Sequence, residues 1–263
     1  MKLLYTSNEV STLEHVRELV EPAATVYDDL DFSCPSAAAR RPFVALNMLS
    51  TIDGKVTLNE SYAQQFGTRV DRDVMFHLRL HFDAVLRGAA TVRENPWYPR
   101  VPEDLVDRRE ERGLTRQPLA VVITTSCRLP LNSQYFGFAQ APAPTIVLTT
   151  EQAPPRNVAA ARERAAVYTA GRDRVDIASA LDILSSEFGV QRLLSEGGPR
   201  LNWDLLKAHC LDELFWTVAP RISGAQRDLS VVRGPAPLDP LAEFKLLTLY
   251  YHEGELFARY RAR

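Results

Sequence analysis

Short apolar runs alternate with amphipathic stretches along most of this chain. Five runs have the β-branched, apolar character of buried strands: residues 43–49, 83–88, 118–124, 143–150 and 165–171. Apolar residues recur with helical spacing at 72–82 and 176–189, and the glycine ending the second segment suits a helix C-terminus. Because parallel strands are joined by long, usually helical crossovers, this alternation predicts an α/β fold with a largely parallel sheet.

The last third of the chain continues this pattern. Residues 190–194 predict a strand, and the apolar residues after Pro199 begin with helical spacing. The Glu-Gly-Gly sequence at 196–198 therefore forms a strand–turn–helix corner, where glycine either permits a positive φ or lets another molecule approach the backbone. Residues 213–222 predict one more strand, and residues 243–261 alternate around a short turn as an antiparallel hairpin does.

Two segments depart from the alternation. Residues 1–40 are interpreted as an N-terminal extension, with a short amphipathic helix at 8–20 and an irregular connection after it. Residues 95–117 are polar and carry a run of charges typical of a solvated loop. The simplest organisation is this extension followed by one domain at residues 41–263.

Composition narrows the class of protein. The 263 residues are 46% hydrophobic and 24% charged, as in an ordinary globular protein, and carry a formal net charge of −2. That charge favours neither nucleic acid nor a membrane surface as partner. No run approaches the roughly 18 apolar residues of a membrane helix, and the first residues do not resemble a signal peptide, so we expect a cytoplasmic protein. The three cysteines are far apart and no zinc motif occurs, so we expect no metal.

Polar or glycine-rich sequence follows four of the predicted strands, at the carboxyl ends where open α/β sheets bind ligands. These ends are STIDGK (50–55), RGAATVRENP (87–96), TTSCR (124–128) and the corner at 196–198. A helix that opens after the corner presents free N–H groups to an anion, and Arg128 suits the 2′-phosphate of an adenosine ribose. Each feature alone is more typical of an ordinary turn, and the Rossmann G-x-G-x-x-G fingerprint is absent from the sequence.

Four blocks of sequence, taken together, are more specific. They are RPFVALNMLSTIDGKV, HLRLHFDAVLRGAATVRENP, VVITTSCRLP and LLSEGGPRLNWDLLKAHCLDELFWTVAPRISG. In this order and at this spacing the chain, from Arg41 to its end, resembles the pyrimidine reductases of riboflavin biosynthesis. Their fold is similar to that of dihydrofolate reductase. The resemblance implies a mostly parallel central sheet with helices on both faces and a C-terminal antiparallel hairpin.

The resemblance also implies the chemistry. The family uses NADPH to reduce a phosphoribosylamino-pyrimidine, delivering hydride to C1′ of the opened sugar, and its members are usually homodimers. The positions that match its cofactor contacts are Gly88, Thr91, Asn95, Thr125, Arg128, Gly197, Gly198, Leu201 and Asn202. Those that match or neighbour its substrate contacts are Asn47, Arg79, Tyr98, Arg100 and Glu196. Asp53 and Glu196 are the expected catalytic residues, with Asp53 as a proton relay.

Several positions depart from the commonest family pattern. Asn47 stands where many bacterial members have lysine, and Leu201-Asn202-Trp203 is similar to the archaeal form. Both favour the 2,5-diamino-pyrimidinone, the substrate before deamination. Arg87 replaces a usual apolar residue and Ala90 a usual glycine. Two alternatives therefore stay open: a reductase of the same fold that acts on a pterin or folate, and a nucleotide-binding protein without catalytic activity.

Overall fold

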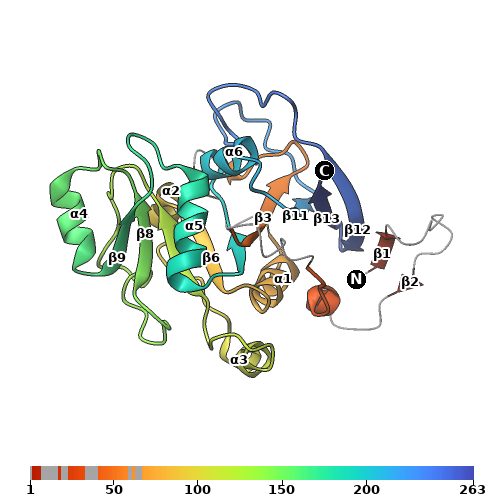
Figure 1. Cartoon of the computed structure of the whole chain (residues 1–263). Helices are drawn as coiled ribbons and strands as arrows, with labels where there is room; N and C mark the ends of the chain where they lie inside the picture. Colours follow the sequence, from red (N-terminus) through yellow and green to blue (C-terminus); the bar gives the residue numbers. More distant parts are fainter. Residues whose placement is uncertain (1, 7–16, 19–22, 33–40, 59–60, 63–66) are drawn as a thin grey trace.

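The computed structural model of the chain describes residues 2–6, 17–18, 23–32, 41–58, 61–62 and 67–263. Its centre is an eleven-stranded sheet in the order β2-β1-β12-β13-β11-β3-β10-β6-β7-β8-β9 (Figure 1). The strands are β1 (Lys2–Thr6), β2 (Arg17–Glu18), β3 (Phe43–Thr51), β6 (Ala84–Gly88), β7 (Leu119–Ile123), β8 (Thr145–Thr149), β9 (Ala165–Thr169), β10 (Arg192–Ser195), β11 (Glu213–Ala219), β12 (Phe244–His252) and β13 (Glu255–Ala262). A separate pair, β4 (Thr57–Leu58) and β5 (Ser61–Tyr62), follows β3.

The sheet has a parallel part and an antiparallel part. All neighbouring strands from β11 through β3, β10, β6, β7 and β8 to β9 are parallel. Beyond β11, the hairpin β13–β12 and then β1 and β2 pair antiparallel. The α/β fold with a mostly parallel sheet and a C-terminal hairpin, predicted from the sequence, is confirmed.

Helices cover both faces of this sheet. They are α1 (Arg69–Arg79), α2 (Ala89–Glu94), α3 (Glu103–Glu110), α4 (Pro155–Arg162), α5 (Ile177–Phe188) and α6 (Pro199–Lys207). Val44 and Leu46 of β3 pack in the same core cluster as apolar residues of α5 and α6. Phe43 and Ala45 lie on the other face of β3, in the cluster that contains residues of α1. Alternate residues of one strand thus build two cores, as expected for a strand buried on both faces.

The ends of the helices follow from local sequence. The side chain of Thr68 accepts a hydrogen bond from the backbone N–H of Asp71 and so caps α1. That helix begins and ends three residues earlier than the apolar spacing predicts. Asp176 caps α5 in the same way through the N–H of Ser179, and Gly189 ends it in the left-handed conformation, as predicted.

The polar segment at 95–117 is not the solvated loop that its composition predicts. It contains α3, and Arg109 of that helix is fully buried. One nitrogen of its guanidinium donates to the carbonyl oxygens of both Arg79 and Phe82 at the end of α1. Gln117 pairs its side-chain amide with both backbone groups of Val101. The charged run therefore includes a residue that fastens this segment to α1, because a buried guanidinium needs several acceptors.

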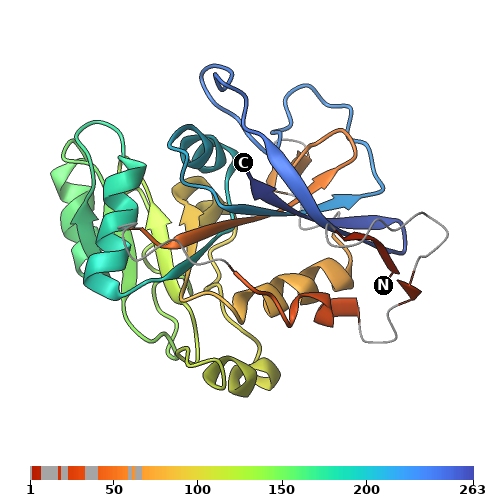
Figure 2. The ribbon, with the colours of Figure 1, turned by 45° about the vertical axis from the view of Figure 1, so that its right-hand side comes forward.

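Residues 2–6 and 17–18 contribute to the sheet, and residues within 23–32 to one core. β1 pairs with β12, and β2, which falls within the helix predicted at 8–20, pairs with β1. The rest of that predicted helix lies outside the described residues. The 3-10 helix at Ala23–Tyr27 lies beside α1 (Figure 2), and Tyr27 meets Phe215 edge-on at 5.1 Å between ring centroids. The division between an extension at 1–40 and a domain at 41–263 remains a prediction.

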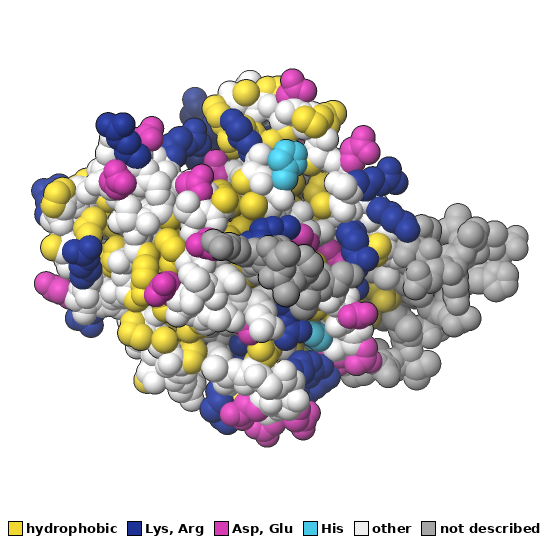
Figure 3. All heavy atoms as spheres, viewed as in Figure 1, with side chains coloured by type: hydrophobic (Ala, Val, Ile, Leu, Met, Phe, Trp, Pro, Cys, Tyr) yellow, Lys and Arg dark blue, Asp and Glu magenta, His cyan; other side chains and the backbone are white. Residues whose placement is uncertain are grey.

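Charged side chains of both signs are interspersed over the face shown in Figure 3. Within the described ranges, no helix is both long enough and apolar enough to cross a membrane. The same residues contain no cluster of three or more His, Cys, Asp or Glu side chains that could hold a metal ion.

Candidate active site

The strand ends that the sequence singles out lie along one edge of the sheet. β3, β10, β6 and β7 are parallel neighbours, so their carboxyl ends lie on the same side. Two backbone hydrogen bonds join the ends of β6 and β10. The N–H of Glu196 donates to Leu86, and the N–H of Gly88 donates to Gly197 at 2.8 Å. The corner at 196–198 is therefore held directly against the start of α2.

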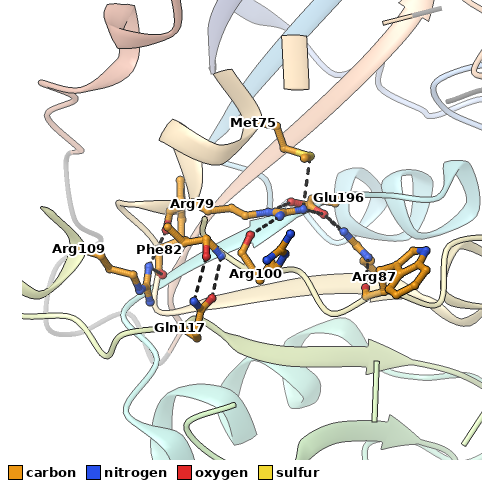
Figure 4. Close-up of polar contacts among 10 residues, drawn as sticks. Met75, Arg79, Phe82, Arg87, Arg100, Arg109, Gln117 and Glu196 are labelled. Atoms are coloured by element: carbon orange, nitrogen blue, oxygen red, sulfur yellow. Dashed lines mark hydrogen bonds and ion pairs between the residues drawn. The ribbon is translucent and has the colours of Figure 1, made fainter. Parts of the chain in front are cut away.

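Glu196 is the centre of a buried charge cluster at this edge (Figure 4). Its Oε1 accepts from Nε of Arg79 at 2.7 Å, and its Oε2 accepts from Nη2 of Arg79 and Nε of Arg87, each at 2.9 Å. The three side chains are 3–7% exposed. We call these three residues the arginine–glutamate cluster. With two cations and one anion it carries a net positive charge, which suits a phosphorylated ligand.

The electrostatics of the cluster keep Glu196 ionised. Burial alone would raise the pKa of this carboxyl, but the guanidinium groups of Arg79 and Arg87 outweigh it and lower the pKa to about 2. Glu196 is therefore an acceptor for hydroxyl or N–H groups near neutral pH and cannot serve as a proton donor there.

Arg87 is the member of the cluster that sequence reasoning missed as a site residue. It is the last residue but one of an otherwise apolar strand, and its Nη1 donates to the carbonyl of Trp97 at 3.0 Å. Arg79 makes the equivalent bond to the carbonyl of Arg100 at 2.6 Å. A charged residue inside an apolar strand requires a buried counter-charge, and this is the signal that identifies Arg87. The two arginines thus fix the loop at 97–100 beside Glu196.

The glycine corner leaves polar groups without partners. Gly197 has φ +76°, and a Cβ there would lie 2.8 Å from Sδ of Met48, so only glycine fits this backbone. Gly198 caps α6 without a side chain, so N–H groups of the first turn remain available. Asn202 is buried and donates to Val231, but its Oδ1, 3.6 Å from that Cβ position, accepts no bond from the described residues.

Asp53 is held in the turn after β3 and is exposed. Its Oδ1 accepts from the Thr51 hydroxyl at 2.6 Å and from the N–H of Ser223, and its Oδ2 accepts from the N–H of Gly224. The Thr51 hydrogen bond is the largest of the effects that lower the pKa of Asp53 to about 2. An ionised carboxyl can accept the hydrogen bonds that hold the loop at 223–224. It does not suit the proton relay expected of Asp53, because a relay must take up and release a proton near neutral pH.

The remaining expected substrate residues fall into two groups. Asn47 is partly exposed on the α1-facing side of β3, and the exposed Arg100 lies beside the arginine–glutamate cluster in Figure 4. Tyr98 is buried instead: its hydroxyl donates to Pro118 at 2.6 Å and its ring stacks on Phe138. The structure therefore places the Tyr98 side chain in the core, with its hydroxyl already satisfied, and not in the expected contact with substrate.

The remaining expected cofactor residues follow β6 and β7. Thr91 and Asn95 lie on α2 and at its end, and Oδ1 of Asn95 is buried without a partner among the described residues. Thr125 and Arg128 are exposed after β7, and Arg93 donates to the carbonyl of Arg128 at 3.0 Å. Leu201 of α6 is buried, 3.9 Å from where a Cβ of Gly88 would be.

This fold and this site define a class of protein. A parallel α/β sheet carries, at its carboxyl edge, a glycine corner that opens a helix and a buried cluster of net positive charge. That combination is typical of an enzyme that binds nucleotides or sugar phosphates. More particularly, residues 42–249 match the family model of the RibD C-terminal domain, and the chain belongs to that family.

Comparisons with individual proteins agree. The chain is 34% identical over 203 residues to the 2,5-diamino-6-ribosylamino-4(3H)-pyrimidinone 5′-phosphate reductase of Methanothermobacter thermautotrophicus, covering 77% of this chain and 88% of the relative. The Archaeoglobus fulgidus reductase of the same name is 28% identical, with 74% and 87% covered. A pyrimidine reductase-like protein from Corynebacterium diphtheriae has the same fold, with a TM-score of 0.75, 19% identity and 92% and 98% of the chains covered.

Proposed function

We propose that this protein reduces 2,5-diamino-6-ribosylamino-4(3H)-pyrimidinone 5′-phosphate to its ribitylamino form, with NADPH as cofactor. The observation that carries the proposal is the placement of Glu196. It is an ionised carboxylate, held by Arg79 and Arg87 directly before a glycine corner, in a chain 34% identical to a reductase of that name. The resemblance of the four sequence blocks to the pyrimidine reductases supports the same conclusion.

The residues present fit a nicotinamide cofactor. The bare backbone at Gly197 and the uncapped start of α6 suit its phosphates, and the unpartnered oxygens of Asn95 and Asn202 suit its hydroxyl or amide hydrogens. The cofactor, when bound, supplies the hydride. The chain orients the sugar: Glu196 accepts from sugar hydroxyls, and the net positive charge of the cluster attracts the phosphate.

NADPH rather than NADH is the cofactor we propose. Arg93 donates to the backbone carbonyl of Arg128 in the loop after β7, and the exposed Thr125 belongs to the same loop. No side-chain hydrogen bond or ion pair of Arg128 occurs in the described part of the chain. A 2′-phosphate would give this loop the anion it lacks. A homodimer and a cytoplasmic location also remain proposals, and light scattering on the purified protein tests the first.

The experiment is a substrate-resolved assay of NADPH loss. The purified protein is mixed with NADPH and, separately, the diamino-pyrimidinone phosphate, its deaminated uracil counterpart and dihydrofolate. We expect NADPH to be consumed fastest with the diamino compound. Glu196→Gln is the matched control for background oxidation, since it keeps the shape of the side chain and removes its charge. If NADPH is lost with neither pyrimidine, the proposed function is wrong.

A further inference from the structure

One buried carboxyl lies outside the site described so far. Asp71 is on α1, and Met75 and Arg79 follow it at intervals of four, so the three side chains share one side of that helix. Sδ of Met75 accepts from Nη2 of Arg79 at 3.4 Å, and Arg79 holds Glu196. Asp71 therefore lies on the side of α1 that faces the arginine–glutamate cluster. It is eight residues away from Arg79, or about 12 Å along the helix axis.

Among the described residues, the surroundings of Asp71 contain a hydroxyl and a second acid but no cation paired with it. The Thr217 side chain of β11 hydrogen-bonds to its carboxyl. Glu255 of β13 is fully buried, and its negative charge also raises the pKa of Asp71. The N–H and hydroxyl of Thr68 donate to Glu255, at 3.2 and 2.6 Å, and so satisfy that second acid. Among the described residues no ion pair of Asp71 occurs.

Asp71 has acceptor capacity left for a ligand. The residue is partly exposed although its carboxyl group is largely covered, and Thr217 beside it is buried. The Thr217 hydroxyl uses at most one of the several acceptor positions of the carboxyl group, and no other hydrogen bond to that group occurs among the described residues. Burial and the charge of Glu255 raise the pKa of Asp71 to about 6, against the lowering effect of the Thr217 bond. A ligand that brought two N–H groups would relieve this unfavourable environment.

We propose that Asp71, oriented by Thr217, recognises the pyrimidine base and selects the 2-aminopyrimidin-4-one over the deaminated uracil. The inference rests on the proposed reductase function. The diamino base presents its N3–H and its 2-amino group side by side, and the two oxygens of a carboxylate accept such a pair in parallel. In the uracil the amino group is replaced by a carbonyl oxygen, which would face the carboxylate and repel it.

The placement also matches the length of the substrate. The base and the phosphorylated sugar are at opposite ends of the molecule, and Asp71 and the arginine–glutamate cluster are two turns apart on the same side of α1. Asn47 is on β3, which lies in the sheet between β11, the strand of Thr217, and β10, the strand before Glu196, and it is on the face that α1 covers. The base is thus assigned to a carboxyl, and the phosphate to arginines.

The test is the ratio of kcat/KM for the diamino and uracil substrates in Asp71→Asn. The amide keeps an acceptor for N3–H but offers N–H donors to the uracil carbonyl. We expect kcat/KM for the diamino substrate to fall about 100-fold, while that for the uracil substrate stays or rises. Asp73→Asn is the matched control, because Asp73 is on the same helix, its side chain is 39% exposed, and its one ion pair to a described residue is to Arg69 at 3.6 Å. It should leave both values unchanged.

The outcomes separate the two proposals. If the wild-type protein reduces neither pyrimidine, the proposed function fails. If it reduces the diamino substrate but Asp71→Asn lowers both rates equally, or changes neither, the assignment of Asp71 is overturned and the function stands. Should Asp71→Asn not fold, Thr217→Val replaces it: we expect a shift of the ratio of about tenfold in the same direction. An unchanged ratio in that variant overturns the assignment equally.

Discussion

Two buried carboxyl groups, that of Glu196 after β10 and that of Asp71 on α1, have opposite environments. Glu196 is held by two arginines, which lower its pKa to about 2. Asp71 has, within the described part of the chain, a hydroxyl and a neighbouring acid beside it, and its pKa is raised to about 6. The first has its counter-charges within the protein and is fixed in one geometry. The second has no counter-charge among the described residues, and we propose that its favourable partner is the substrate base. A buried charge that the fold does not neutralise is a candidate for ligand recognition, whereas one that it does neutralise orients what is bound.

The largest effect should come from neutralising the first carboxyl. Glu196→Gln leaves two buried guanidinium groups without a counter-charge, and we expect the free energy of unfolding to fall by about 3–5 kcal/mol. Urea denaturation near neutral pH measures it. The activity should fall with both pyrimidines, since we propose that the residue contacts the sugar that they share. An unchanged stability would show that the arginines find other acceptors.

Neutralising the second carboxyl, that of Asp71, should change the free energy of unfolding in the opposite direction. A pKa of about 6 in place of 3.8 means that ionised Asp71 costs up to about 3 kcal/mol in the folded protein. We therefore expect Asp71→Asn to raise the free energy of unfolding above pH 6. The gain should fade as the pH falls from 6 to 4, where the carboxyl is protonated in the wild type as well. Denaturation curves at several pH values measure this.

Asp73→Asn provides the control, because its exposed charge should change stability by no more than about 0.5 kcal/mol at any of these pH values. A loss of stability in Asp71→Asn at neutral pH would contradict the comparison, since it would mean that the fold already stabilises the ionised form.

Arg87→Leu should weaken the arginine–glutamate cluster with a smaller loss of stability than Glu196→Gln. Glu196 keeps its bidentate bonds to Arg79, so we expect a loss of about 1–3 kcal/mol and a higher pKa for Glu196. Leucine resembles the apolar residue usual at this position, and it leaves the carbonyl of Trp97 unbonded. Thermal unfolding with and without substrate measures both stability and binding. Equal losses for Arg87→Leu and Glu196→Gln would show that one arginine is not enough to hold the carboxylate.

The smallest effect is expected for Arg128, an exposed residue away from both Glu196 and Asp71. Arg128→Ala should raise the KM for NADPH about tenfold and leave that for NADH nearly unchanged, because only NADPH has a 2′-phosphate. Stability should not change, since the residue is exposed. Initial-rate measurements with both cofactors test it, and an equal rise for both would count against a 2′-phosphate contact.

The sequence predicted more of the fold than of the electrostatics. The alternation of apolar runs identified β3, β6, β7, β8 and β9 because each is a local pattern. The capped and glycine-ended helix α5 was predicted for the same reason. Helix α3 was missed because its residues are mostly charged, and what stabilises it is the contact of Arg109 with the end of α1. The β1–β12 pairing was missed because it joins the two ends of the chain.

The sequence alone determined which segments are strands, where the glycine corner lies and which family the chain resembles, since these depend on short-range periodicity and on local motifs. Only the tertiary structure decided which charges meet. Arg79 and Arg87 precede Glu196 by more than a hundred residues, and nothing local to any of them reveals the pairing. It also decided that Asp71, an ordinary helix residue in the sequence, is a buried acid with no ion pair to any described residue. Burial and partners are properties of the packed chain, and they set the pKa of each carboxyl.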